Sequence, residues 1–256
     1  MSAQPSSAET GMTLVEHLAE LRHRLIVCVV AVAVGMVAGF ILYPWVFDIL
    51  LAPYERIATA DNSIADGKLV QIDPLEGFSI RMKTSAYTGI AFAMPVILWQ
   101  IWKFVTPGLY PHERRYAVPF VASALTLFVL GAGLAYYTLP RALEFLVDIG
   151  GDDLVTAFAP GKYFQLITYM MLAFGIGFEF PIVLIFLQMA GVLETDTLRK
   201  GRRFAIVGIL VLVAVITPSG DPISMLMLSV PMIIFYEIAI VAGSIITRRQ
   251  AEKAAA

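Results

Sequence analysis

The sequence has little charge and almost no cysteine or histidine, and each shortage excludes a class of protein. Only 15% of its 256 residues are charged, whereas 59% are hydrophobic. This composition excludes an ordinary soluble domain and is typical of multi-pass membrane proteins. The net charge of -2 argues against a nucleic-acid-binding surface.

The residues that build metal centres and catalytic sites are also scarce. The single cysteine, Cys28, can neither form an internal disulfide nor complete a thiolate metal site. The three histidines, His17, His23 and His112, are too scattered for a metal centre, so we expect no metal and no cofactor. No segment matches the phosphate-binding loop of ATPases, and no apolar segment pairs a nucleophile with a base. We therefore predict that the chain is not an enzyme.

What the sequence does have is six long apolar segments. They cover residues 25–43, 84–102, 117–139, 164–190, 204–216 and 223–246. About 20 apolar residues are enough for a helix to cross a bilayer. We predict an all-α polytopic membrane protein with a single membrane domain at 13–247, a disordered tail at 1–12 and a cytoplasmic tail at 248–256.

The distribution of positive charge predicts the orientation. Six crossings put both termini on one side, and that side carries twelve lysines and arginines against six on the other. Loops rich in these residues stay in the cytoplasm. We therefore expect both termini to be cytoplasmic.

The fifth apolar segment is too short to cross comfortably. Its 13 residues, Phe204 to Ile216, make a helix of about 20 Å, against a hydrocarbon core of about 30 Å. The turn that follows, 217–222, contains no positive charge, so we expect a tight hairpin. A helix too short for the bilayer is a candidate docking site for a single-span partner. We expect the partner to contact Val207, Leu210 and Val213, with a polar contact at Thr217.

Two carboxylates lie inside the predicted spans. Glu179 is near mid-depth, where an ionised group costs about 2.5 to 3.5 kcal/mol or more. It is either protonated and bonded to a neighbouring helix or exposed to a water-filled concavity, and we favour the second interpretation. Pro181 should bend this helix beside it. Both interpretations stay open for Glu237, in the sixth segment.

Two polar elements stand at the predicted cytoplasmic face. Before the first span, an amphipathic helix spaces Glu16, Glu20 and Arg24 four residues apart. Between the second and third spans, two prolines and a glycine rule out a continuous helix, and the resulting loop ends at Glu113 beside two arginines. We expect this loop to form half of a recognition site.

These residues together resemble the TatC family, the multi-span subunit of the twin-arginine protein translocase. The matching stretches are EHLAELRHR at 16–24, WQIW at 99–102, FVTPGLY at 104–110, ERR at 113–115, FEFP at 178–181, TP at 217–218 and FYE at 235–237. Two positions depart from the family form: Ser219 and Gly220 make the last turn one residue longer, and Met225 replaces a glutamine.

The resemblance implies a cup-shaped bundle of six helices with two short C-terminal helices, located in the bacterial cytoplasmic membrane. It further implies a receptor that binds twin-arginine signal peptides. With single-span TatA and TatB-type partners, and as a multimeric complex, such a receptor exports folded proteins by using the proton motive force. The alternative function is a proton-coupled small-molecule transporter that uses Glu179, although the spans supply few further polar residues for a path.

The resemblance also assigns site residues. It places the arginine-pair site at Glu20 and Glu113, supported by Arg22, Phe104, Leu109 and Tyr110, and it places outer or partner positions at Pro53, Thr217 and Asp221. A carboxylate can accept two hydrogen bonds from one guanidinium, so two arginines require two carboxylates. The alternative is that both glutamates form exposed pairs with neighbouring arginines, each worth at most about 1 kcal/mol.

Overall fold

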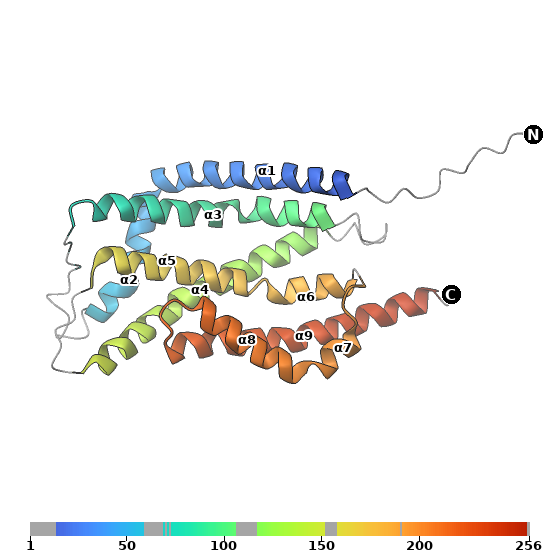
Figure 1. Cartoon of the computed structure of the whole chain (residues 1–256). Coiled ribbons are helices and arrows are strands. Elements are labelled where there is room, and N and C mark those ends of the chain that lie inside the picture. The colour runs from blue at the N-terminus through green and yellow to red at the C-terminus, as the bar shows by residue number, and fades with distance from the viewer. Residues whose placement is uncertain are drawn as a thin grey trace, which may run out of the picture.

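The computed structural model describes residues 14–58, 69, 71, 73–105, 117–151, 158–189 and 191–254, with side chains described between residues 18 and 245. All regular structure in these residues is helical (Figure 1). The helices are α1 (Leu14–Ile41), α2 (Tyr43–Ala58), α3 (Glu76–Val105), α4 (Ala117–Gly150), α5 (Pro160–Gly177), α6 (Phe180–Met189), α7 (Thr195–Lys200), α8 (Arg202–Ile216) and α9 (Pro222–Ala254).

The helices confirm the all-α membrane class. Five helical stretches are long and apolar enough to cross a membrane, namely those of α1, α3, α4, α5 with α6, and α9. The remaining predicted span, α8, has 15 residues and is short, as expected. The prediction of two short C-terminal helices is wrong for the second, because α9 has 33 residues. The start of α1 and the end of α9 lie at the same end of the bundle, as an even number of crossings requires (Figure 1).

The bundle is arranged as a row of helices crossed by one oblique helix. In Figure 1, α1 and α3 lie along one edge, α5 and α6 in the middle, and α8 and α9 along the other edge, while α4 runs diagonally across them. Glycines allow the closest approaches. A Cβ atom on Gly35 of α1 would lie 2.5 Å from the carbonyl oxygen of Gly89 on α3, and one on Gly131 of α4 would lie 2.5 Å from that of Phe174 on α5.

The third span is longer than the apolar run indicated. The predicted span ended at residue 139, but α4 continues through Pro140 to Gly150. Ala142 and Leu143 are each only 2% exposed, so the turn after the proline is held by packing. Burial of these apolar side chains outweighs the loss of one backbone hydrogen bond at the proline.

The segment after the first span forms a helix that closes the end of the bundle opposite the start of α1. Residues 43–58 make α2, which contains Pro53. Its buried Tyr54 contacts Tyr163 of α5, with ring centroids 5.4 Å apart, and Phe47 stacks on Phe164 at 4.6 Å. This aromatic cluster anchors α2 across α5 (Figure 1). Residues 59–68, which follow α2, lie outside the described residues.

The fourth span is interrupted, as the proline predicted. Helix α5 ends at Gly177 and α6 begins at Phe180, with Pro181 in the first turn of α6. Proline suits the first turn of a helix because the missing N–H would have no helical partner there. Phe178 and Glu179 form the turn between the two helices.

Candidate recognition site

The charged end of α1 is attached to α3 through Arg24. The Arg24 Nε–H donates to Glu20 Oε1 at 3.1 Å, and its Nη2 also contacts that oxygen. The Nη1 group donates to Gln100 Oε1 on α3 at 3.3 Å. Further along the chain in α1, the same helix face packs tightly against α3, where Gly35 meets Gly89. Close packing therefore sets the register in which Glu20, Arg24 and Gln100 meet.

Arg24 binds only one of the two carboxylate oxygens of Glu20. Its Oε2 atom is buried and has no hydrogen-bond partner among the described residues. An unsatisfied buried acceptor costs about 1–3 kcal/mol, more for a charged group. A guanidinium donor that reached this oxygen would remove that cost through a charge-assisted hydrogen bond.

The other predicted recognition residues divide into those near Glu20 and those outside the described residues. Arg22 is exposed on α1, and Phe104 is half-buried in the last turn of α3. Glu113, Leu109 and Tyr110 lie outside the described residues. The structure thus brings Glu20 beside α3, the helix whose end leads into the predicted loop.

Sequence reasoning did not assign Gln100 a role. The structure shows that it receives the hydrogen bond from Arg24 across 76 positions of sequence. Lys103, one turn further on, lies 5.6 Å from the centre of the Trp99 ring. The local sequence feature that could have indicated a role for Gln100 is that this glutamine interrupts an apolar run next to two tryptophans. Nothing local to the sequence could pair it with Arg24.

Glu179 lies at the break between α5 and α6. Its Oε1 atom is buried and has no hydrogen-bond partner among the residues that the structure describes, and the residue as a whole is half-exposed. Helical hydrogen bonding resumes at Glu179, because the N–H of Val183 donates to the Glu179 carbonyl at 3.1 Å. Because Oε1 has no described partner, the Glu179 carboxyl group does not link two described helices through this oxygen.

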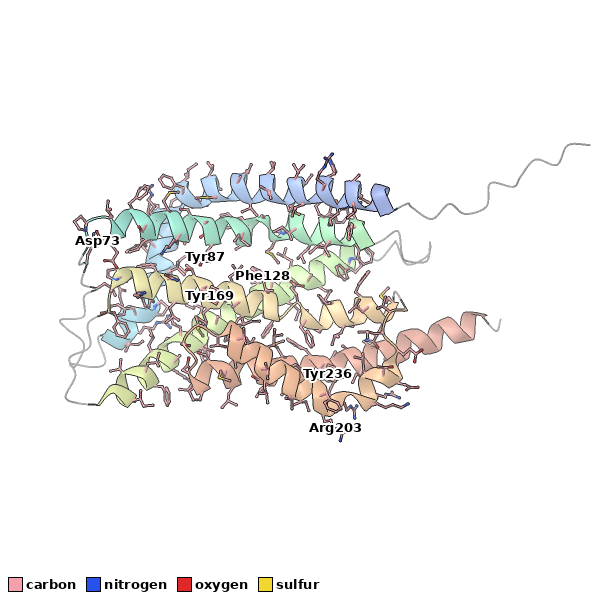
Figure 2. All side chains as sticks on the ribbon, viewed as in Figure 1. Asp73, Tyr87, Phe128, Tyr169, Arg203 and Tyr236 are labelled. Carbon is pink, nitrogen blue, oxygen red and sulfur yellow. The ribbon has the colours of Figure 1, made fainter. Side chains whose placement is uncertain are left out.

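Glu237 has a structural partner that its sequence position did not suggest. The Arg202 Nη2 group lies 2.8 Å from Glu237 Oε2, and both side chains are about half-exposed. Next to it, the Tyr236 hydroxyl donates to the Leu198 carbonyl at 2.7 Å. Figure 2 shows Tyr236 and Arg203 at this end of α8 and α9. These contacts join α9 to α7 and to the first turn of α8.

The three residues expected at outer or partner positions are buried and are bound within the chain. The Thr217 hydroxyl donates to the Val213 carbonyl at 2.8 Å, and the residue is 4% exposed. Asp221 Oδ1 accepts the Ser224 N–H at 2.7 Å, which caps the start of α9, and its other oxygen accepts the Ser219 hydroxyl. Pro53 is buried inside α2. Thr217 and Asp221 thus form hydrogen bonds within the chain, and Pro53 is buried.

The described residues contain no group of three or more histidine, cysteine or acidic side chains that could hold a metal ion. The fold defines a multi-span membrane protein with a polar cluster where α1 meets α3.

The chain belongs to the TatC family. The family model described as "Sec-independent protein translocase protein (TatC)" matches residues 16–231. The chain is 39% identical over 251 residues to the TatC protein of Frankia casuarinae, covering 96% of this chain and 69% of that protein. It is 37% identical over 244 residues to the TatC protein of Aquifex aeolicus, covering 94% and 98% respectively.

Solved structures agree with this membership. The chain superposes on the crystal structure of a twin-arginine translocase receptor, TatC, in DDM with a TM-score of 0.76 and 37% identity, covering 89% of this chain and 99% of that one. The chain is therefore a component of the Sec-independent protein translocase, an integral protein of the cytoplasmic membrane and not an enzyme.

Proposed function

We propose that the chain is the receptor that binds twin-arginine signal peptides, with Glu20 and Glu113 as the carboxylates that accept the arginine pair. The observation that carries this proposal is the unpaired, buried Oε2 atom of Glu20. Arg24 already uses the other oxygen, so the carboxylate is held in place with one acceptor available. The solved structure titled a twin-arginine translocase receptor supports the same function.

In this proposal Arg22, Phe104, Leu109 and Tyr110 line the site around the two carboxylates. TatA and TatB-type single-span proteins assemble with the chain, which also self-associates, and the proton motive force drives export of the folded substrate. The alternative of a small-molecule transporter lacks a supporting observation, because the family to which the chain belongs translocates proteins.

The first prediction tests the arginine-pair site. We expect Glu20→Lys and Glu113→Lys each to abolish binding of a twin-arginine signal peptide, because each replaces an acceptor with a repelling cation. The milder change Glu20→Gln should weaken binding roughly tenfold to a hundredfold, the equivalent of one charge-assisted hydrogen bond. Cross-linking of a labelled signal peptide to the purified protein measures both effects.

A matched control separates recognition from general charge. Asp196→Lys makes the same change on α7, at the same end of the bundle, where the side chain is 77% exposed. This variant should bind the peptide normally, and all four variants should insert and assemble with partners. Normal cross-linking by a double Glu20→Ala, Glu113→Ala variant would rule out the proposed site.

A further inference from the structure

A hollow lined by both polar and apolar residues lies at the end of the bundle opposite Glu20, between the first turns of α3 and α5. Its volume is about 280 Å³, and its polar lining comes from Asp73, Glu76, Ser79, Lys83, Lys162 and Gln165. Figure 2 shows Asp73 at this end of the molecule. None of these residues belongs to the recognition site described above.

The two carboxylates of the hollow are already bound to the backbone. Asp73 Oδ1 accepts the Leu75 N–H at 2.8 Å in the turn that leads into α3. Glu76 Oε1 accepts the Gly161 N–H at 2.7 Å and so caps the start of α5. A Cβ atom at position 161 would lie 2.8 Å from that oxygen, so glycine permits the contact. Both acids therefore serve to position the helix ends.

The two lysines of the hollow remain available. Lys83 and Lys162 are exposed, and neither forms an ion pair with any residue that the structure describes. The other cation on this part of α3, Arg81, is directed to α1, where it donates to the Phe40 carbonyl at 3.3 Å. The two lysines balance the charge of Asp73 and Glu76 in the same lining, and their ammonium groups supply the donors that an anionic ligand needs.

A second hollow continues from the first and is mostly apolar. It measures about 360 Å³, shares Lys162 and Gln165 with the first, and is otherwise lined by Leu166, Tyr169, Val215, Ile216 and Pro218. It runs between α5 and the end of the short helix α8. Lys162 thus lies between the two hollows, and Lys83 lines the first alone.

We propose that these two hollows bind one phospholipid molecule. Its phosphate lies between Lys83 and Lys162, and an acyl chain lies along the groove between α5 and α8. The apolar groove favours a lipid over a free phosphate ion, because a free ion would leave the groove walls unfilled. Under the positive-inside orientation this lipid belongs to the outer leaflet.

The test measures lipid binding to the full-length protein, purified in dodecyl maltoside, by native mass spectrometry with added palmitoyl-oleoyl-phosphatidylglycerol. A lysine near a lipid phosphate contributes about 1 kcal/mol, so each Lys→Gln change should weaken binding about fivefold and the double variant about 25-fold. Lys83→Arg with Lys162→Arg keeps both charges and should retain binding. Lys200→Gln, which removes an exposed lysine of α7, is the matched control and should bind as the unmodified protein does.

Two competitors identify the part of the lipid that is recognised. Dioleoylglycerol, which has the tails without the phosphate, and glycerol phosphate, which has the phosphate without tails, should each compete poorly. Equal competition by glycerol phosphate would make this a site for a soluble anion and overturn the lipid assignment. Equal competition by dioleoylglycerol, or unchanged binding in the double Gln variant, would overturn the role of the lysines.

Discussion

Tyr136 compensates for a proline inside a helix. Pro53 has no N–H, so the carbonyl of Ile49, four residues earlier in α2, lacks its helical donor. The Tyr136 hydroxyl of α4 donates to that carbonyl at 2.9 Å. The Tyr163 hydroxyl of α5 donates to the next carbonyl, that of Leu50, at 2.6 Å. Pro53 therefore creates an acceptor by which α2 is attached to the bundle.

This arrangement gives a second prediction. Tyr136→Phe should destabilise the protein by about 0.5–1.5 kcal/mol, because the Ile49 carbonyl then loses this donor. Adding Pro53→Ala restores the missing N–H, so the double variant should recover part of that loss. Tyr137→Phe is the matched control, since Tyr137 is 57% exposed and should have little effect. Thermal unfolding of the proteins in detergent measures all three, and additive losses would contradict the explanation.

A third prediction concerns Glu179. Because its Oε1 atom has no described partner, Glu179→Gln and Glu179→Leu should change stability little. If the group faces a wet concavity, Leu should nevertheless impair transport, whereas Gln should be tolerated. A cysteine at 179, with Cys28 replaced, should then react with a water-soluble thiol reagent. Loss of stability by more than about 1 kcal/mol with normal transport would favour the structural role.

Among the elements, the pair of α1 and α3 depends on the absence of side chains. A Cβ atom on Gly89 would lie 2.5 Å from the Met36 backbone nitrogen and 2.7 Å from its Cα. Small residues let transmembrane helices approach closely enough for backbone packing. Along the same interface, Arg24 reaches Gln100. The register of the recognition site therefore depends on these glycines.

The fourth prediction follows from that interface. Gly89→Ala must push α1 away from α3 and should cost about 1–3 kcal/mol. It should also weaken signal-peptide binding, since Arg24 and Gln100 would separate. Gly133→Ala is the control, because a Cβ atom there meets nothing within 4 Å. Unfolding in detergent and peptide cross-linking should distinguish the two variants, and equal behaviour would show that α1 adapts freely.

Helix features that depend on the local sequence could be predicted, whereas those that depend on contacts between residues far apart in the chain could not. Apolar length located five spans and the short α8, and Pro181 located the break between α5 and α6. The end of α4 was misplaced because burial of Ala142 and Leu143 overrides the signal of Pro140. The position of α2 in the bundle could not be predicted, because its packing partners are on α4 and α5.

At the scale of the whole molecule, the candidate sites also depend on contacts between residues far apart in the chain, which could not be predicted. The pairing of Arg202 with Glu237 and that of Arg24 with Gln100 join residues 35 and 76 positions apart, and no periodicity reports them. Motif resemblance indicated the family, which the comparisons confirm, and it is the basis for placing Glu20 in the proposed site. It also suggested an outward contact for Thr217, whereas the structure buries that hydroxyl against Val213.

The docking face that we expected on α8 must likewise be revised. Val213 is fully buried, so it cannot contact a partner. Val207, Val211 and Val215 are 59%, 58% and 77% exposed and recur every four residues along one face. A helix of 15 residues is about 22 Å long, so this face lies where the bilayer and the protein do not match.

The fifth prediction tests whether a single-span partner covers this face. Cysteines at Val207 and Val211, which do not line the proposed lipid groove, should cross-link to the partner helix in a background without Cys28, whereas a cysteine at the buried Val213 should not. Inserting four leucines into α8 lengthens it by about 6 Å and relieves the mismatch, so it should weaken transport while leaving signal-peptide binding unchanged. Signal-peptide binding is the control because Glu20 lies on α1, at the other edge of the row of helices (Figure 1). If the exposed cysteines cross-link to nothing and the lengthened protein exports normally, lipid alone covers α8 and the helix is a scaffold for α9.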